Sequence, residues 1–390
     1  MKTRVMMLRL LMVFALAVVT VGAVGVRGSG MALAQDNMSC AGEPIGGDAA
    51  AASPEAGASP MAGMDMGMGS PMAGMEMGTP AAGGGGDLNI AFLPKDVVNP
   101  YFGTAAQGGQ GAAAELGGQF QQVGPQTSNA AEQVTYIQTL TQQQVGAIAV
   151  SANDPNALAQ SLKDAMAQGI KVVSFDSDVA PDARQIFVNQ ANAEQIGRIE
   201  VQIMGGLLNC QGEIAILSAA STMTNQNTWI SFMEDELSKP GYENMTLVET
   251  AYGDDDPQIS YDKTVELLTA YPDLKGIISP TTVGITAAAQ ALEAEGRGGD
   301  VQLTGLGTPN QMRAYVKSGT VKEFALWNPA DLGYLAYYAA ARLITGEITG
   351  AEGETFEAGR LGSYTVGANG EVLLGPPFIF NAENIDQFDF

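Results

Sequence analysis

The chain contains no histidine among its 390 residues, and it has only two cysteines. Without histidine, the Ser-His-Asp and Cys-His arrangements of nucleophilic catalysis are excluded, and the commonest zinc ligand is missing. We therefore expect no catalytic residues, no metal and no cofactor. The two cysteines, Cys40 and Cys210, leave three states open: a disulfide between them, a lipid on Cys40, or free thiols.

Basic residues are also scarce, with 18 Lys and Arg against 42 Asp and Glu, which gives a formal net charge of −24. Four of the basic residues and none of the acidic ones fall in residues 1–34, so the remainder carries 14 basic minus 42 acidic residues, or −28. A chain of this charge repels phosphate backbones. We therefore expect no nucleic-acid partner.

Residues 1–34 are typical of a secretory signal peptide: a basic start, an apolar run over 10–26, and small residues Ala32 and Ala34 at the expected cleavage site. An uncleaved membrane anchor is the alternative, but the polar Thr20 interrupts the apolar run and favours cleavage. We expect the protein to be exported across the cytoplasmic membrane, to the periplasm or the outer face of the cell membrane.

Residues 35–86 consist mainly of Ala, Gly, Ser, Pro and Met, with few branched apolar side chains. Such a segment buries too little surface to offset the entropy of ordering it, so we predict a disordered tether. Within it, residues 59–67 recur in similar form at 70–78, and seven methionines lie between positions 61 and 77. Thioethers suit Cu(I), but a low-complexity spacer explains the repeat more simply, because no cysteine or histidine accompanies it.

From residue 88 onward, short apolar runs alternate with helical patterns at a regular pace. We expect strands at 88–93, 120–123, 147–150, 172–175, 186–188, 214–217, 246–251, 277–278, 302–305 and 324–326. We expect helices at 100–116, 129–144, 156–168, 193–208, 226–237, 257–270, 284–295, 311–318 and 330–344. This alternation predicts an α/β protein with parallel sheets wrapped by right-handed crossovers. The number of strands favours two Rossmann-like, doubly wound lobes over a single sheet.

The strand expected at 172–175 ends abruptly in Asp176 and Asp178. A carboxylate just past the carboxyl end of a parallel strand lies at the crevice where open α/β sheets bind ligands. Asp176 is therefore our expected ligand anchor, with a turn cap as the alternative, whereas Asp178 is expected to turn or cap the loop. The next strand ends at Asn189 and Gln190, where we expect the chain to leave the first lobe.

Other strands also end in polar or aromatic residues. Because the carboxyl ends of parallel strands converge at the ligand crevice, which we call the crevice rule, we expect these residues to lie together. Our candidate ligand-binding residues are Lys95, Tyr101, Phe102, Asp176, Gln190, Asn225, Gln226, Pro280, Thr282, Trp327 and Asn328. This mixture of amides, hydroxyls, charges and aromatic rings suits a neutral polyhydroxylated ligand. Two alternatives stay open, namely a solvated loop charge for Lys95 and a core position for Trp327. The acidic run 254–256 before Pro257 could bind calcium, but a helix cap explains it more simply.

An enzyme of carbohydrate metabolism is a weaker hypothesis, based on the close carboxylates Asp176 and Asp178. We expect Asp178 to turn or cap the loop after the strand, so the two carboxylates are not expected to flank one bond. We therefore predict a binding protein and no enzyme.

Several stretches carry a family resemblance. They are VSANDPNAL at 150–158, KVVSFDSDVAPDAR at 171–184, FVNQA at 187–191, TNQNTW at 224–229, IISPTTVG at 277–284, GLGTPNQM at 305–312 and FALWNPADLGY at 324–334. With them, the chain from residue 88 to its end resembles the periplasmic sugar-binding proteins of ABC importers (type I periplasmic binding proteins). The rhamnose-binding branch is most similar, and the autoinducer-2-binding branch lies beside it.

The resemblance implies two lobes joined by a three-segment hinge that closes on the ligand. On this template the N-terminal lobe comprises 87–190 and 329–350. The C-terminal lobe comprises 191–328 and part of 351–390. A monosaccharide would be the ligand, an ABC permease in the membrane the partner, and a monomer the working form. A receptor that passes its autoinducer-2- or sugar-bound form to a signalling partner is the alternative.

In the autoinducer-2 branch the ligand is held by a lysine, an aspartate, an Asp-Gln pair and a Pro-x-Ala segment. The matching positions here are Lys95, Asp176, Asn225 with Gln226, and Pro280 with Thr282. Asn225 replaces an aspartate and Thr282 an alanine. These two departures favour a deoxyhexose such as rhamnose, or another simple monosaccharide, over autoinducer-2.

Overall fold

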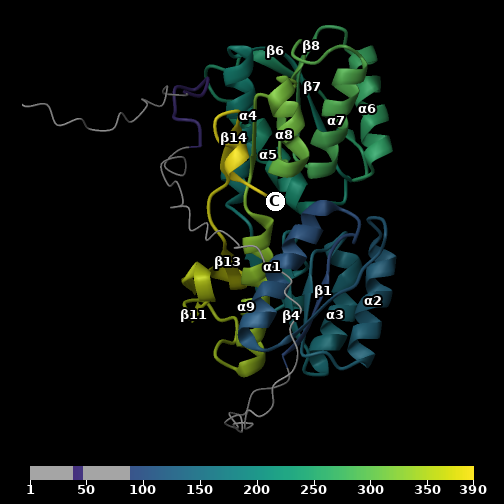
Figure 1. The fold of residues 1–390 in the computed structure, drawn as a ribbon, viewed down its shortest axis with the longest axis vertical. Helices are drawn as coiled ribbons and strands as arrows, with labels where there is room; N and C mark the ends of the chain where they lie inside the picture. The colour runs from purple at the N-terminus through teal and green to yellow at the C-terminus, as the bar shows by residue number, and fades with distance from the viewer. Residues whose placement is uncertain (1–37, 47–87) are drawn as a thin grey trace, which may run out of the picture. The chain divides into compact units, whose positions relative to one another are not determined.

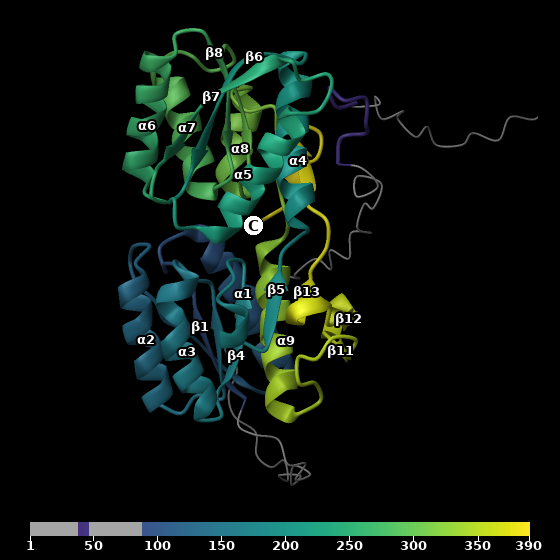
Figure 2. The same ribbon diagram turned by 180° about the vertical axis from the view of Figure 1, so that it is seen from behind.

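Two parallel β-sheets, each covered by helices on both faces, organise the chain (Figures 1 and 2). The computed structural model describes residues 38–46 and 88–390, all of which fall in one unit that spans 37–390. The main strands of the described part are β1 Asn89–Leu93, β2 Gln119–Gln122, β3 Ala147–Val150, β4 Lys171–Phe175, β5 Ile186–Asn189, β6 Gln211–Ser218, β7 Asn244–Tyr252, β8 Leu274–Ser279, β9 Gln302–Gly305 and β10 Glu323–Leu326. Its α-helices are α1 Pro100–Leu116, α2 Ala130–Gln142, α3 Pro155–Ala167, α4 Ala193–Leu208, α5 Thr224–Leu237, α6 Pro257–Ala270, α7 Thr282–Ala294, α8 Pro309–Ser318 and α9 Pro329–Thr345.

The sheet of the first lobe has the strand order β13-β5-β4-β3-β1-β2, in which the short strand β13 (Glu371–Leu373) forms one edge. All of its neighbouring strands pair in parallel. Helices α1 and α9 pack against each other on one face, and α2 packs with α3 on the other. Because both faces are covered, the central strands are continuous apolar runs: β3 is buried at every position, and β4 at all but its first.

Helices α1 and α9 approach each other closely because small residues lie where they meet. A Cβ added to Gly108 would lie 1.8 Å from the carbonyl oxygen of Ala330, and one added to Gly333 would lie 1.8 Å from that of Ala105. Any larger residue at either glycine would therefore push the helices apart. Gly108 and Gly333 therefore allow the close packing of these two helices.

The second lobe is built on a four-stranded parallel sheet of order β7-β6-β8-β9. Helices α4 and α5 pack together on one face, and α6 and α7 on the other. Strand β10 lies next to β9 through a parallel bridge between Leu306 and Ala325. The last strand, β14 (Phe378–Asn381), pairs antiparallel with β10, where Phe324 opposes Phe380.

The chain passes between the two sheets three times. The first crossing connects β5 to α4, the second connects β10 to α9, and the third connects β13 to β14. The predicted fold class, two doubly wound lobes with a three-segment hinge, is therefore confirmed. The bounds of α1, α4 and α6 agree with the sequence prediction, whereas the short strands after residue 350 were not predicted, because segments of three or four residues show no clear periodicity.

Residues 38–46 fold onto the second lobe, so the prediction of a disordered tether over 35–86 is wrong for this part. Cys40 forms a disulfide with Cys210, which follows α4. Beside it, Ile45 is 7% exposed, and Lys239 pairs with Glu43 at 3.0 Å. Of the three states left open for the cysteines, the structure thus has the disulfide, and neither sulfur is free for a lipid. The predicted signal peptide 1–34, the rest of the tether and its methionine repeat lie outside the described residues.

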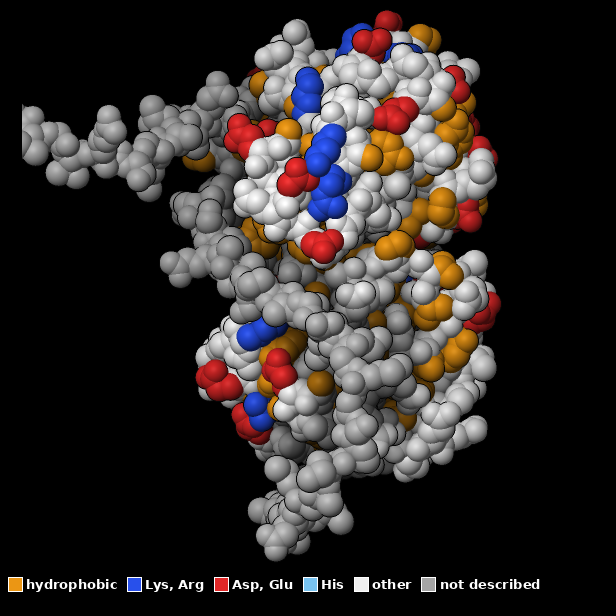
Figure 3. Space-filling view, in the orientation of Figure 1, with side chains coloured by type: hydrophobic (Ala, Val, Ile, Leu, Met, Phe, Trp, Pro, Cys, Tyr) orange, Lys and Arg blue, Asp and Glu red, His pale blue; other side chains and the backbone are white. Residues whose placement is uncertain are grey.

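Charged side chains of both signs lie side by side on the face shown in Figure 3, where basic side chains form a row over the second lobe next to acidic ones. In α8 of that lobe, Arg313 and Lys317 both pair with Asp386, at 3.3 and 2.8 Å. Over 38–46 and 88–390, no helix is both long and apolar enough to cross a membrane.

Candidate functional site

A cavity lies between the two lobes, where the carboxyl ends of strands from both sheets meet. We call it the main cavity; it encloses about 360 Å³, including its open mouth. Its lining residues are Lys95, Asn99, Tyr101, Phe102, Asp176, Asn225, Gln226, Trp229, Asp255, Pro280, Thr281, Thr282, Leu306, Leu326 and Trp327. Nine of the eleven residues proposed from the sequence are among them. The crevice rule therefore located this cavity, while the ligand contacts of its residues stay a prediction.

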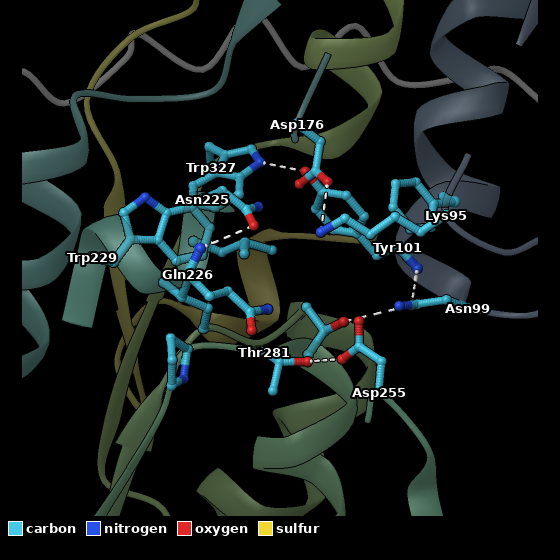
Figure 4. Close-up of a pocket in the computed structure, with 15 residues that line it drawn as sticks. Lys95, Asn99, Tyr101, Asp176, Asn225, Gln226, Trp229, Asp255, Thr281 and Trp327 are labelled. Atoms are coloured by element: carbon cyan, nitrogen blue, oxygen red, sulfur yellow. Dashed lines mark hydrogen bonds and ion pairs between the residues drawn. The ribbon is translucent and has the colours of Figure 1, made fainter. Parts of the chain in front are cut away.

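On the first-lobe side, a buried ion pair joins two strand ends (Figure 4). The Lys95 ammonium, after β1, lies 3.3 Å from the carboxylate of Asp176, after β4. The two residues are 3% and 5% exposed. The Ser151 hydroxyl, after β3, donates to the same carboxylate at 2.7 Å. Asp176 has a φ of 61°, a left-handed conformation that Asp tolerates better than most residues and that directs this side chain out of the strand's line.

Buried side-chain amides form hydrogen bonds with the backbone of the loops next to this ion pair. The Gln133 amide nitrogen donates to the carbonyl oxygens of Pro94 and Ser151, at 2.9 and 2.8 Å. The Asn153 side chain donates to the carbonyl oxygen of Lys95 at 2.8 Å. The strand-end residue Asn153 therefore positions Lys95 and does not line the main cavity.

Two aromatic residues from different segments of the chain meet at the cavity. The indole nitrogen of Trp327, after β10, donates to the Tyr101 hydroxyl at 2.9 Å, and their rings pack edge to face with centroids 6.3 Å apart. Burial, and next the negative charge of Asp176, raise the pKa of Tyr101 well above its ordinary value of 10. The hydroxyl is therefore neutral at physiological pH and can act as a hydrogen-bond donor.

The second lobe contributes amides from the first turn of α5. The Gln226 side-chain oxygen accepts from the Ser218 hydroxyl and from the backbone N–H of Ala219, both at 2.9 Å. Because its oxygen is held in this way, the orientation of the Gln226 amide is fixed. The Asn225 oxygen accepts from the backbone N–H of Gln226 at 2.9 Å. Asn225 is not the N-cap of α5, because that position is occupied by Met223.

Asp255 is a cavity residue that the sequence reasoning missed. The acidic run 254–256 was interpreted as a helix cap, and Asp256 does cap α6 by accepting from the N–H groups of Gln258 and Ile259. Asp255, however, has a φ of 53° and accepts a hydrogen bond from the Thr281 hydroxyl. Burial raises the pKa of Asp255, while Lys95 and Thr281 oppose the shift.

The other lining residues that were not among the eleven candidates are Asn99, Trp229, Thr281, Leu306 and Leu326. Asn99 caps α1 and also receives a hydrogen bond from the Thr282 hydroxyl of the other lobe, at 3.5 Å. Trp229 lies within α5, one turn beyond the strand-end positions that the crevice rule selects, and its ring centroid is 6.0 Å from that of Trp327. The helical spacing of Asn225 and Trp229, four residues apart on one face, was the signal that could have found it.

Two predicted residues do not line the main cavity. Asn328 caps α9 through the backbone N–H of Ala330, at 2.9 Å. Gln190 lies in a neighbouring cavity. Asp178 also lies outside the main cavity, because Arg184 pairs with both of its carboxylate oxygens at 2.6 and 2.7 Å. Across the described ranges, 38–46 and 88–390, no cluster of three or more Cys, Asp or Glu side chains could hold a metal ion.

The polar groups of the main cavity are oriented before any ligand arrives, and aromatic rings lie among them. Such a cavity can bind a small polar molecule and exclude analogues that leave its own groups unpaired. The family model for the periplasmic binding protein domain matches residues 90–348, and the chain belongs to this family. The family predicted from the sequence is thereby confirmed.

Solved structures with the same fold include proteins of several bacteria. A sugar ABC transporter from Actinomyces odontolyticus is 46% identical, with a TM-score of 0.64, over 77% of this chain and 97% of that one. An ABC transporter solute-binding protein from Clostridium phytofermentas, with bound L-rhamnose, is 39% identical, with a TM-score of 0.75, over 78% and 98%. LsrB from Clostridium saccharobutylicum, in complex with AI-2, is 27% identical, with a TM-score of 0.74, over 77% and 99%.

Proposed function

We propose that this protein is an extracytoplasmic solute-binding protein that captures a rhamnose-like monosaccharide in the main cavity and delivers it to an ABC transporter. The observation that carries the proposal is the composition of the cavity, which combines an oriented ion pair, fixed amides, hydroxyls and aromatic rings from both lobes. The similarity to sugar-binding proteins of ABC transporters supports it. Binding would require no covalent chemistry, so we propose no enzymatic activity.

The two lobes supply different parts of the proposed contact. Lys95 and Asp176 would bond vicinal hydroxyls from the first lobe, while Asn225 and Gln226 would do so from the second. Because the groups belong to separate lobes, a sugar between them would favour the closed arrangement over an open one. The Thr282–Asn99 contact already joins the lobes and would add to that preference. The permease would then recognise the closed form.

A deoxyhexose fits the cavity better than a fully hydroxylated sugar. Its methyl group needs an apolar surface, and Phe102, Leu306 and Leu326 supply one among the polar lining residues. The L-rhamnose-bound relative is 39% identical, whereas the AI-2-bound relative is 27% identical. Asn225 and Thr282 also depart from the residues expected for autoinducer-2. We therefore rank L-rhamnose above autoinducer-2.

The proposal extends to the chain outside the cavity. The signal peptide would be removed by cleavage after residue 34, which would release the protein on the outer side of the cytoplasmic membrane. We further propose that the protein works as a monomer, with the lobe bounds 87–190 with 329–350, and 191–328 with part of 351–390.

A ligand screen tests the function directly. Thermal unfolding of the protein without residues 1–34 is measured with L-rhamnose, D-ribose, D-arabinose, D-glucose and autoinducer-2, and calorimetry follows for every compound that raises the Tm. A true ligand at 100 times its Kd stabilises the protein by about 2.7 kcal/mol. Stabilisation by L-rhamnose supports the proposal in full. Stabilisation by autoinducer-2 alone supports the receptor alternative, and no response to any sugar contradicts the proposed function.

A further inference from the structure

A second cavity lies next to the main cavity, on the side where β5 leads into α4. We call it the side cavity; it encloses about 540 Å³, including its opening to solvent. Its lining residues are Asp176, Asp178, Phe187, Asn189, Gln190, Ala193, Thr224, Asn225, Thr228 and Trp229. Like the main cavity, it is formed by residues of both lobes.

The two cavities are adjacent because they share lining residues. Asp176, Asn225 and Trp229 line both of them. In Figure 4 these three residues lie across the main cavity from Asn99 and Asp255. A molecule held by Asp176 and Asn225 in the main cavity is therefore within reach of the side cavity without crossing a lobe. No other side chains are common to the two linings.

Gln190 gives the side cavity an unused hydrogen-bonding group. This residue is 1% exposed, and its side-chain oxygen has no hydrogen-bond partner among the described residues. A buried amide oxygen without a partner costs stability, and a bound donor would remove that cost. Because the unpartnered atom is a carbonyl oxygen, the group that it selects is a donor such as a hydroxyl.

Asn189 and Asp178, which also line the side cavity, already have partners. The Asn189 amide donates to Glu371 at 2.7 Å, and the Asp178 carboxylate is paired with Arg184. The Phe187 and Trp229 side chains add apolar surface. The combination of a hydroxyl acceptor with aromatic surface, beside the acidic Asp176, suits a neutral sugar ring and disfavours an anionic one such as a uronate or a sugar phosphate.

We propose that the side cavity is a second saccharide subsite, so that the protein binds a neutral disaccharide or glycoside whose first ring occupies the main cavity. This inference rests on the proposed function and extends it. The Gln190 oxygen accepts a hydroxyl of the second ring. Thr224 and Thr228, which are both exposed at the opening, mark the side from which the second ring reaches solvent.

The test blocks the side cavity without altering the main cavity. In Thr228→Trp, the indole fills the opening, and Thr224→Trp serves as a second blocking variant. Thr135→Trp in α2 is the matched control. Thr135 and Thr228 are both exposed helix residues, and each hydroxyl donates to the carbonyl oxygen four residues earlier, at 3.4 and 2.8 Å. Neither threonine lines the main cavity.

The probes are L-rhamnose, methyl α-L-rhamnopyranoside, and rhamnose-containing disaccharides that are joined through each hydroxyl in turn, with a uronic acid disaccharide as the charged probe. Their Kd values are measured by calorimetry for all four proteins. We expect at least one neutral disaccharide or glycoside to bind the wild type. We expect each blocking variant to weaken its affinity at least about tenfold, or 1.4 kcal/mol, while L-rhamnose binding is unchanged. The control should bind every probe as the wild type does.

Three results overturn the inference while leaving the proposed function intact. The first is a wild type that binds L-rhamnose but no disaccharide or glycoside. The second is equal affinity of the wild type and both blocking variants for every extended probe that binds. The third is tighter binding of the uronic acid probe than of the neutral ones. A protein that binds none of the sugars contradicts the proposed function itself and, with it, the second subsite.

Discussion

The Lys95 ammonium and the Asp176 carboxylate form a buried ion pair, 3.3 Å apart, at the junction of β1 and β4. Both residues are more than nine-tenths buried, so each charge depends on the other for compensation. The same carboxylate also faces the main cavity. Asp176 is therefore placed to affect both the stability of the first lobe and the capture of a sugar.

We expect Asp176→Asn to weaken sugar binding and to lower the stability of the ligand-free protein. Loss of charge-assisted hydrogen bonds costs about 1.5–3 kcal/mol each, and leaving Lys95 buried without a partner costs about 3–5 kcal/mol. Calorimetry and thermal unfolding measure the two effects. The matched control is Asp182→Asn, which removes the exposed partner of Lys163 and should change neither quantity. Normal affinity in the Asp176 variant would show that the ligand lies elsewhere.

Glu200 in α4 should make stability depend on pH. It is fully buried, neither of its carboxylate oxygens has a hydrogen-bond partner in the described part of the chain, and burial raises its pKa well above the ordinary value of 4.5. A raised pKa in the folded state means that the folded protein holds the proton more tightly than the unfolded chain does. The stabilisation that comes from this tighter proton binding is present in full below pH 4.5, and it is lost as the pH rises through the folded-state pKa.

Glu200→Gln should therefore leave the Tm nearly unchanged near pH 4 and raise it at neutral pH. The amide matches the protonated carboxyl in shape and cannot ionise. Glu234→Gln in α5 is the control, because Glu234 is exposed and has no side-chain hydrogen bond to a described residue. The measurement is a series of unfolding curves between pH 4 and 8. Parallel Tm profiles of the wild type and Glu200→Gln would show that Glu200 does not titrate as expected.

Removing the Cys40–Cys210 disulfide should destabilise the protein without changing its affinity for the sugar. The bond joins residues separated by 170 positions, and loss of a native disulfide costs about 2–5 kcal/mol. Neither cysteine lines the main cavity. A Cys40→Ser, Cys210→Ser double variant should thus unfold at a lower temperature and bind sugar with the wild-type Kd. Thiol alkylation followed by mass spectrometry of the wild type checks the premise, since two reactive thiols under oxidising conditions would contradict it.

Tryptophan fluorescence should report ligand binding directly. The chain has only two tryptophans, Trp229 and Trp327, and both line the main cavity. A bound sugar replaces water next to the indoles, so we expect a change in emission that saturates at the calorimetric Kd. Single Trp→Phe variants at each position assign the signal to one ring. An emission spectrum that stays constant at saturating ligand would place the sugar outside this cavity.

Much of the candidate site could be predicted because parallel strands impose a simple rule. Lys95, Asp176 and Trp327 each lie within two residues of the end of a strand, and the carboxyl ends of such strands meet at one edge of the sheet. The rule failed for Asp255 and Trp229, because these side chains reach the cavity through a left-handed turn and through the second turn of a helix. Neither effect follows from strand ends alone.

Residues 38–46 show a second limit of the sequence. Their composition predicts disorder, and a segment this small cannot form a core of its own. The disulfide to Cys210 and the burial of Ile45 against the second lobe order the segment in the structure. Contacts over so long a separation leave no local pattern, so only the folded chain could show which of the three cysteine states applies.

The sequence alone determined the α/β class, the two lobes and the strand ends that surround the main cavity, because hydrophobic periodicity and strand-end chemistry are local properties. Tertiary structure decided which of those ends face a ligand. In the folded chain Lys95 pairs with Asp176, Asn328 caps α9, and Gln190 lines the side cavity. These outcomes depend on how the two lobes and the three crossings pack. That packing brings together residues that lie far apart in the chain.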